Sequence, residues 1–314
     1  MNFFSKGLFA LSILIGVHGS SYSIEVQGHR GARGLFPENT LPAFAAAIEA
    51  GTHTLELDLH VTKDGEVIIH HDYFVDDWLD EGDQTSKMPQ MLIRDLRLVE
   101  LKKIDCGSKI NMDFPKQQRI PGASIPTLDE LFEMISRSSS PHAKTVRLNL
   151  EVKRDPRYPE LTINARELAA KIVAKVHSAG FSQRVYYSSF DPEILSELHS
   201  LDPEAELGFI FNADSMALVK RLSPDNPMNL LIYLASSFNA TVISPEHALL
   251  TDQKTVHAMQ NAGFRVVPWT VNSEEEWGKC IEMGVDGLIT DYPQDLLSYL
   301  NKQKAHQSLK SSPK

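Results

Sequence analysis

Residues 24–40 read IEVQGHRGARGLFPENT, and this one stretch passes from a strand through a glycine-rich turn into a helix. The strand-like run at 24–28 ends directly before His29 and Arg30. Glycines allow a ligand to approach the backbone, arginine supplies a forked donor, and a helix start carries the positive end of a dipole. The stretch therefore predicts an anion site beside a group that can transfer a proton.

The same strand-to-helix step recurs along the chain. Strand-like runs lie at 24–28, 54–60, 146–152, 185–189, 206–211, 241–244, 265–271 and 286–290. Amphipathic helical patterns lie between them, for example at 40–50, 162–179, 192–200, 252–262 and 274–283. Eight strands alternating with helices predict an α/β fold, a closed parallel (β/α)₈ TIM barrel, with an open doubly wound sheet as the rival.

One region interrupts this alternation. Residues 73–125 are rich in Asp, Lys, Pro and Gly, with one helical stretch near 93–103. We expect an inserted lobe after the second strand and its hairpin, within a single barrel domain spanning 24–300. The tail at 301–314 is polar and rich in Lys and Ser, and we expect it to be frayed.

The N-terminal residues 1–23 resemble a secretory signal peptide. Lys6 gives a weakly positive start, 7–17 is apolar, and small residues follow at 21–23. The apolar run is shorter than the ~20 residues that span a bilayer. The sequence predicts export, to the periplasm or outside the cell, and the alternative is a buried N-terminal helix.

The amino-acid composition of the chain limits the kinds of partner that it can bind. The chain has 314 residues, 42% of them hydrophobic and 23% charged, with a formal net charge of -10. No basic stripe is visible, which argues against nucleic acid as a partner. The two cysteines, Cys106 and Cys280, are too few for a disulfide framework, and we expect Cys280 to be a buried thiol.

Two carboxylates lie two residues apart on the second strand. Glu56 and Asp58 therefore point to the same face. Asp64-Gly65 is a strong signal for a two-residue hairpin turn, and counting back from it places Asp58 opposite His71. His70 would then point to the opposite face of the strand and have a structural role. The pattern predicts an imidazole beside two carboxylates.

Glu151 and Lys153 repeat this spacing near the end of another buried strand. The simple interpretation is an ion pair at the rim of the barrel. The functional one is that Glu56, Asp58 and Glu151 bind a hard divalent cation while Lys153 faces an anion. Three carboxylates without thiolates suit Ca²⁺ or Mg²⁺ better than Zn²⁺.

These motifs together resemble the glycerophosphodiester phosphodiesterases, specifically the exported bacterial kind, over residues 26–300. The matching segments are His29-Arg30-Gly31, Pro37-Glu38-Asn39-Thr40, Glu56-Leu57-Asp58, Thr62-Lys63-Asp64-Gly65, His71-Asp72, Asn149-Leu150-Glu151-Val152-Lys153, Ser189-Phe190, Pro268-Trp269-Thr270-Val271-Asn272 and Gly284 to Pro293. The chain departs from the family after His71-Asp72, where residues 73–76 lack the common Leu-x-Arg-Thr-Thr run.

The resemblance implies a role for each matching residue. It makes His29 and His71 the general acid/base pair. It makes one divalent cation, Ca²⁺ or Mg²⁺, the cofactor, with Glu56, Asp58 and Glu151 as ligands. Phosphate or substrate binding falls to Arg30, Lys153, Trp269 and Glu38, where Glu38 either touches the ligand or orients Arg30.

The implied reaction is metal-dependent hydrolysis of glycerophosphodiesters, such as glycerophosphocholine or glycerophosphoethanolamine, to sn-glycerol 3-phosphate and an alcohol. The nearest alternative is a phospholipase-type phosphodiesterase acting on intact lipids, although no basic amphipathic helix for docking on a bilayer is visible. A binding protein that has lost catalysis is a second alternative, and the complete residue set argues against it. The sequence leaves open which histidine is the base, whether water or the glycerol 2-hydroxyl attacks, and the oligomeric state.

Overall fold

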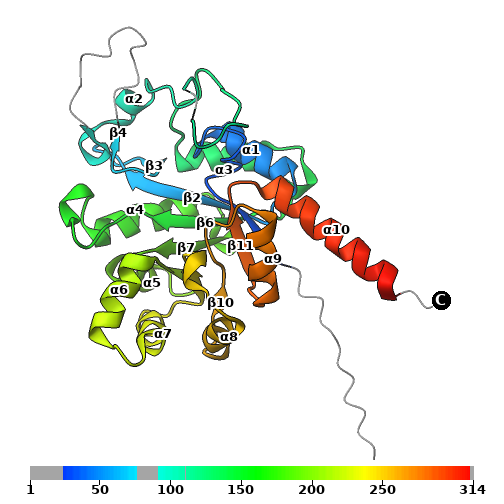
Figure 1. The fold of residues 1–314 in the computed structure, drawn as a ribbon. Coiled ribbons are helices and arrows are strands. Elements are labelled where there is room, and N and C mark those ends of the chain that lie inside the picture. Colours follow the sequence, from blue (N-terminus) through cyan, green and yellow to red (C-terminus); the bar gives the residue numbers. More distant parts are fainter. Residues whose placement is uncertain (1–23, 76–90, 110, 312–314) are drawn as a thin grey trace, which may run out of the picture.

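A computed structural model describes residues 24–75, 91–109 and 111–311 (Figure 1). The predicted signal peptide at 1–23 lies outside these residues, as does part of the predicted insertion, 76–90. Within the described ranges, no helix combines enough length and apolar character to cross a bilayer.

Parallel strands form the centre of the molecule. In chain order they are β1 (Glu25–Gly28), β2 (Thr54–Val61), β6 (Arg147–Val152), β7 (Val185–Ser189), β8 (Glu206–Phe211), β9 (Val242–Pro245), β10 (Arg265–Val266) and β11 (Gly287–Thr290). They pair in the order β10-β9-β8-β7-β6-β2-β1-β11. The amides of Asp286 and Ile289 donate to the carbonyls of Val266 (2.9 Å) and Pro268 (3.0 Å), which joins the two ends of this path. The predicted (β/α)₈ TIM barrel is confirmed.

Seven of the predicted strands agree with the observed ones to within one residue. The exception is the prediction of 265–271, because β10 ends at Val266. Pro268 follows two residues later and has no N–H to donate to a neighbouring strand.

Strand β2 shows how the sequence directs side chains into the barrel. All eight of its residues are buried. Leu55, Leu57 and Leu59 alternate with polar residues and belong to the main hydrophobic core. Because successive strand residues point to opposite faces, Glu56 and Asp58 face the barrel interior.

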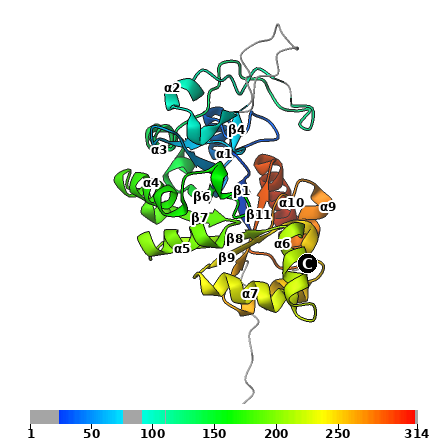
Figure 2. The same ribbon diagram turned by 90° about the vertical axis from the view of Figure 1, so that its left-hand side faces the viewer.

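Helices surround the sheet, as Figures 1 and 2 show. They are α1 (Leu41–Glu49), α3 (Leu128–Arg137), α4 (Ala165–Ser178), α5 (Pro192–Leu201), α6 (Ala213–Leu222), α7 (Pro227–Ser237), α8 (Gln253–Asn261), α9 (Glu274–Glu282) and α10 (Pro293–Ser311). The expectation of a frayed tail was wrong for 301–311, which continue α10. Lys, Gln and Ala in this segment are good helix formers, even where residues 301–306 are exposed.

The region of the predicted insertion has little regular structure in its described part. It contains β4 (Phe74–Val75), β5 (Met91–Leu92), a 3₁₀ helix at Ile93–Asp95 and α2 (Leu98–Leu101). The predicted helical stretch at 93–103 is thus divided into two short helices. The region also contacts the loop between β1 and α1. The Gln117 side chain donates to the carbonyls of Arg33 (2.8 Å) and Phe36 (3.0 Å). Both cysteines, Cys106 in this region and Cys280 on α9, are free, and Cys280 is buried as predicted.

Candidate active site

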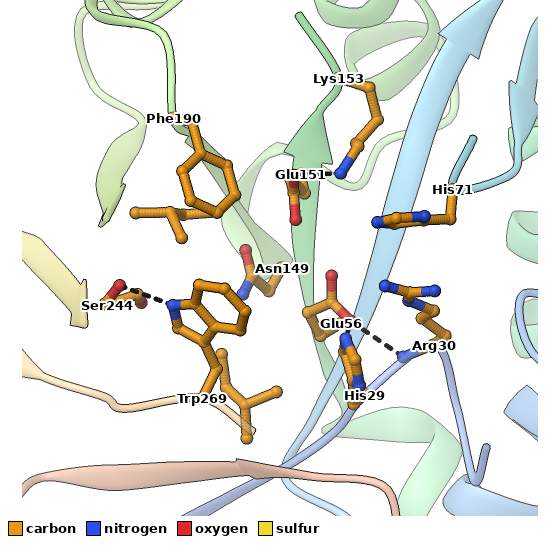
Figure 3. Close-up of a pocket in the computed structure, with 12 residues that line it drawn as sticks. His29, Arg30, Glu56, His71, Asn149, Glu151, Lys153, Phe190, Ser244 and Trp269 are labelled. Atoms are coloured by element: carbon orange, nitrogen blue, oxygen red, sulfur yellow. Dashed lines mark hydrogen bonds and ion pairs between the residues drawn. The ribbon is translucent and has the colours of Figure 1, made fainter. Parts of the chain in front are cut away.

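A pocket opens at the carboxyl ends of the barrel strands, where sites of this fold lie. Its lining consists of His29, Arg30, Glu56, His71, Asn149, Glu151, Lys153, Phe190, Ile210, Ser244, Trp269 and Ile289. Figure 3 shows the two imidazoles and the Arg30 guanidinium on one side of the pocket, opposite Phe190 and Trp269. Seven of the nine predicted site residues therefore line one pocket. The other two, Asp58 and Glu38, lie behind it.

The glycine-rich turn after β1 brings Arg30 to the carboxylates. Arg30 has a φ of 51° and Gly31 a φ of 88°, so both adopt the left-handed conformation. A Cβ on Gly31 would lie 2.7 Å from the carbonyl carbon of Ala43, so this position needs glycine. The turn directs the Arg30 amide at Glu56, where it donates to Oε2 at 2.9 Å.

Three carboxylates from two adjacent strands meet beside the pocket, and two of them, Glu56 and Glu151, line it. Glu56, Asp58 and Glu151 each offer an oxygen within 4.8 Å of the others. Asp58 on β2 pairs in register with Glu151 on β6, which accounts for their proximity. Burial, and then the negative charges of Asp58 and Glu151, raise the pKa of Glu56 well above its usual value.

Two cations lie against these carboxylates. Lys153 Nζ lies 2.7 Å from Glu151 Oε1 and 3.4 Å from Asp58 Oδ1. Arg30 Nε lies 3.3 Å from Asp58 Oδ2. Burial disfavours the Asp58 charge, but Arg30 and Lys153 lower its pKa overall. The simple ion pair between Glu151 and Lys153 is thus present.

The carboxylate group fits a hard divalent cation. Three acidic charges face only two basic ones, and Asp58 Oδ1 is buried without a hydrogen-bond donor. After burial, the negative charges of Asp58 and Glu151 raise the pKa of Glu56, and a cation held among the three carboxylates would relieve this repulsion. Carboxylate oxygens are the ligands that Ca²⁺ and Mg²⁺ prefer.

His29 is held between a buried carboxylate and the pocket. Its Nδ1 lies 2.7 Å from Asp291 Oδ1, and its Nε2 lies 3.9 Å from Glu56 Oε2. Burial, and then the charge of Arg30, lower the pKa of His29 despite Asp291. The ring is therefore favoured in its neutral form.

His71 reaches the pocket by a different route from the predicted one. The turn after β2 has three residues rather than two, because the Thr62 amide donates to the Glu66 carbonyl and Gly65 has a φ of 87°. Thr62 Oγ1 stabilises this turn by accepting from the Glu66 amide at 3.0 Å.

The predicted register was therefore wrong by one residue. Asp58 lies opposite His70, whose amide donates to the Asp58 carbonyl at 3.0 Å. The strand β3 (Val67–Ile69) ends before either histidine. His71 then lines the pocket, and its Nδ1 lies 2.7 Å from Asp72 Oδ1.

An apolar wall faces the charged side of the pocket. Trp269 is fixed by a hydrogen bond of 2.9 Å from Nε1 to the Ser244 carbonyl. The ring of Phe190 packs edge-to-face against it, with centroids 5.7 Å apart. Ile210 and Ile289 complete the wall.

Glu38 contacts the pocket only through arginine. Its Oε1 accepts from Arg30 Nη1 at 2.6 Å, and its Oε2 lies 2.5 Å from Arg33 Nε. Burial raises the pKa of Glu38, but these two arginines lower it overall. Of the two predicted roles, the geometry corresponds to orienting Arg30.

Sequence reasoning did not assign Asn149, Phe190, Ser244 or Asp291 to the site. Phe190 and Asp291 each follow the last residue of a barrel strand, and Ser244 lies near the end of β9. This position at the carboxyl end of a strand was the available signal. A polar Asn149 two residues before Glu151 on the same strand was a second one.

Comparisons with known proteins agree with this geometry. The profile of the glycerophosphoryl diester phosphodiesterase family matches residues 29–295. A glycerophosphodiester phosphodiesterase of Caldanaerobacter subterraneus subsp. tengcongensis is 29% identical over 278 residues, covering 88% of this chain and 98% of the relative. A candidate glycerophosphoryl diester phosphodiesterase of Silicibacter pomeroyi has a TM-score of 0.79 and 26% identity, over 91% of this chain and 95% of that one. An Oleispira antarctica phosphodiesterase in complex with the product sn-glycerol-3-phosphate has a TM-score of 0.67 and 26% identity, over 88% of this chain and 96% of that one.

Proposed function

Since the chain belongs to the glycerophosphoryl diester phosphodiesterase family, we propose that it hydrolyses the glycerophosphodiesters left by phospholipid deacylation. The substrates are compounds such as glycerophosphocholine and glycerophosphoethanolamine, and the products are sn-glycerol 3-phosphate and an alcohol. One observation carries the proposal: two imidazoles, two basic side chains and two members of an acidic cluster line a single pocket with an apolar wall.

Glu56, Asp58 and Glu151 would hold one divalent cation, Ca²⁺ or Mg²⁺. When bound, this ion supplies positive charge to the phosphoryl oxygens as negative charge develops on them. Arg30 and Lys153 bind the phosphate from their places in the pocket lining. Their charges persist, because Asp58 and Glu151 outweigh the effect of burial and raise the pKa of Lys153, and Asp58 likewise raises that of Arg30.

His29 and His71 divide the proton transfers. One imidazole removes a proton from the attacking hydroxyl, which belongs either to water or to the glycerol 2-position. The other donates a proton to the leaving alkoxide oxygen. Imidazole suits both tasks because its ordinary pKa is near neutral.

Trp269 and Phe190 form a wall against the carbon skeleton of the glycerol or the alcohol. The hydrogen bond to Ser244 fixes the indole, so the wall is formed before substrate enters. A flat apolar face opposite the charged groups orients the diester with its phosphate toward Arg30 and Lys153.

A panel of glycerophosphodiesters tests this function. Glycerophospho-choline, -ethanolamine, -glycerol and -inositol are each offered with Ca²⁺ or Mg²⁺, and release of sn-glycerol 3-phosphate is measured. Phosphatidylcholine vesicles test the alternative, a phosphodiesterase acting on intact lipids. Turnover of vesicles without turnover of any soluble diester would reject the proposal in favour of that alternative.

We further propose that the protein is exported, in the periplasm or outside a bacterial cell. Support comes from the short apolar run at 7–17 after Lys6. Fractionation of the expressing cells, with N-terminal sequencing of the product, tests this. Intact protein retained in the cytoplasm would contradict export.

A further inference from the structure

The ends of the first and last barrel strands place His29 beside Asp291. Gly28 on β1 pairs in register with Thr290 on β11, and the next residue of each strand is His29 and Asp291. The His29 amide donates to the Thr290 carbonyl at 2.9 Å. Backbone pairing thus sets the position of both side chains, and Nδ1 of the imidazole lies 2.7 Å from Oδ1 of the carboxylate.

Asn272 fixes the carboxylate from the other side. Its Oδ1 accepts from the Asp291 amide at 2.9 Å, and a backbone amide can only donate. This bond sets the orientation of the Asn272 side chain, so its Nδ2 donates to Asp291 Oδ2 at 2.7 Å. The remaining oxygen, Oδ1, is left to accept a hydrogen bond from His29 Nδ1.

This pair is largely buried. The Asp291 side chain is 3% exposed and that of His29 is 11% exposed. Other charged groups also face the pair: Arg30 acts on His29, Glu56 lies 3.9 Å from Nε2, and Arg33 lies 3.8 Å from Asp291 Oδ1. By contrast, Asp72, which contacts Nδ1 of His71, has a side chain that is 72% exposed.

We propose that Asp291 is a positioning residue that holds neutral His29 with its proton on Nδ1, so that the Nε2 lone pair faces the reacting groups. A neutral imidazole carries one N–H, and the carboxylate can only accept it. This inference rests on the proposed function, in which His29 transfers a proton. Asn272 supports the arrangement by fixing Asp291.

The substitution Asp291→Asn tests the inference because the network dictates how the new amide lies. Its oxygen must accept from Asn272 Nδ2, which leaves its NH₂ group facing His29 Nδ1. That group donates to Nδ1 and forces the proton onto Nε2, the opposite tautomer. We expect kcat to fall by at least about 100-fold, with KM changed by less than about threefold.

Tautomers are read directly from long-range ¹H–¹⁵N spectra of histidine-labelled protein near pH 8, with His29→Gln assigning the signal. We expect Nδ1 protonation in the wild type and a shift to Nε2 protonation in Asp291→Asn. The matched control is Asp286→Asn, just before the opposite end of β11, where Oδ2 accepts from the Val266 amide. It should leave both kcat and the His29 tautomer unchanged, and a melting curve establishes that each variant is folded.

Three results would each overturn the inference. The first is wild-type His29 carrying its proton on Nε2. The second is an unchanged His29 tautomer in folded Asp291→Asn, and the third is an unchanged kcat in that variant. Failure of the proposed function is distinguishable, because wild-type protein would then release no sn-glycerol 3-phosphate from any diester of the panel, while the tautomer of His29 stays measurable.

Discussion

Glu38 does not line the pocket, yet its Oε1 accepts a hydrogen bond of 2.6 Å from Nη1 of Arg30, which does. The substitution Glu38→Gln keeps the volume and removes the charge that holds this guanidinium. We expect the inhibition constant of sn-glycerol 3-phosphate to rise about 5- to 30-fold, which corresponds to the loss of a charged hydrogen bond of about 1–2 kcal/mol. Exposed Glu133→Gln is the control, and equal inhibition constants in both variants would contradict the orienting role.

Each of the two pocket histidines should be indispensable for catalysis. We expect His29→Gln and His71→Gln each to reduce kcat by about 10²- to 10⁴-fold, the usual contribution of a proton transfer. The melting temperature should change little. His70→Gln is a matched control, because His70 adjoins His71 but does not line the pocket. Near-normal turnover in His29→Gln or His71→Gln would remove the two-histidine mechanism.

Chelation should abolish activity, and Ca²⁺ or Mg²⁺ should restore it.

Calorimetry should also show that the affinity of the protein for the ion rises with pH. Burial and the charges of Asp58 and Glu151 raise the pKa of Glu56, so at lower pH the ion must displace a proton from this carboxyl. Glu56→Gln should weaken binding, whereas Glu66→Gln, on the hairpin outside the pocket, should not. Full turnover after exhaustive chelation would exclude a metal requirement.

Removing the indole should impair substrate binding. We expect Trp269→Ala to raise KM about tenfold, since a buried aromatic contact contributes about 1–2 kcal/mol. Trp269→Phe keeps a flat apolar face but loses the hydrogen bond to Ser244, and an intermediate KM is expected. Unchanged KM and kcat in the alanine variant would mean that Trp269 serves packing alone.

His60 should make the protein sensitive to acid. Burial lowers its pKa to about 3, so the folded state resists protonation that the unfolded chain accepts below about pH 6.5. Stability contributed by neutral His60 is therefore lost progressively as pH falls from about 6.5 towards 3. His60→Phe keeps a ring against Tyr73, which packs edge-to-face at 5.3 Å.

Urea unfolding measures the effect. Between about pH 7 and pH 4.5, the wild type should lose about 2–3 kcal/mol more unfolding free energy than His60→Phe. Parallel losses in the two proteins would show that His60 does not titrate in this way.

Local patterns were sufficient to predict the strands and the inward-facing carboxylates. The alternation of Leu55, Leu57 and Leu59 with polar residues placed Glu56 and Asp58 on one face, and the barrel confirmed it. Predicting the hairpin register failed, because one side chain, Thr62 Oγ1, stabilises a three-residue turn that the Asp-Gly signal does not reveal.

Long-range neighbours could not be derived from periodicity. Asp291 is 262 residues from His29, and only closure of the barrel brings them together. The contact within the apolar wall could not be derived from periodicity either. Phe190 and Trp269 follow different strands and meet only when β7 and β10 occupy their places in the sheet.

The pairing of β1 with β11 also sets the moment at which this enzyme can begin to work. The residues of β1 are synthesised well before their partner on one side, residues 287–290. Until then the barrel of the nascent polypeptide is open beside His29, because β1 has no β11 to pair with. Catalysis by the newly made protein thus requires synthesis of the chain through β11, and shortened products lacking β11 should be inert.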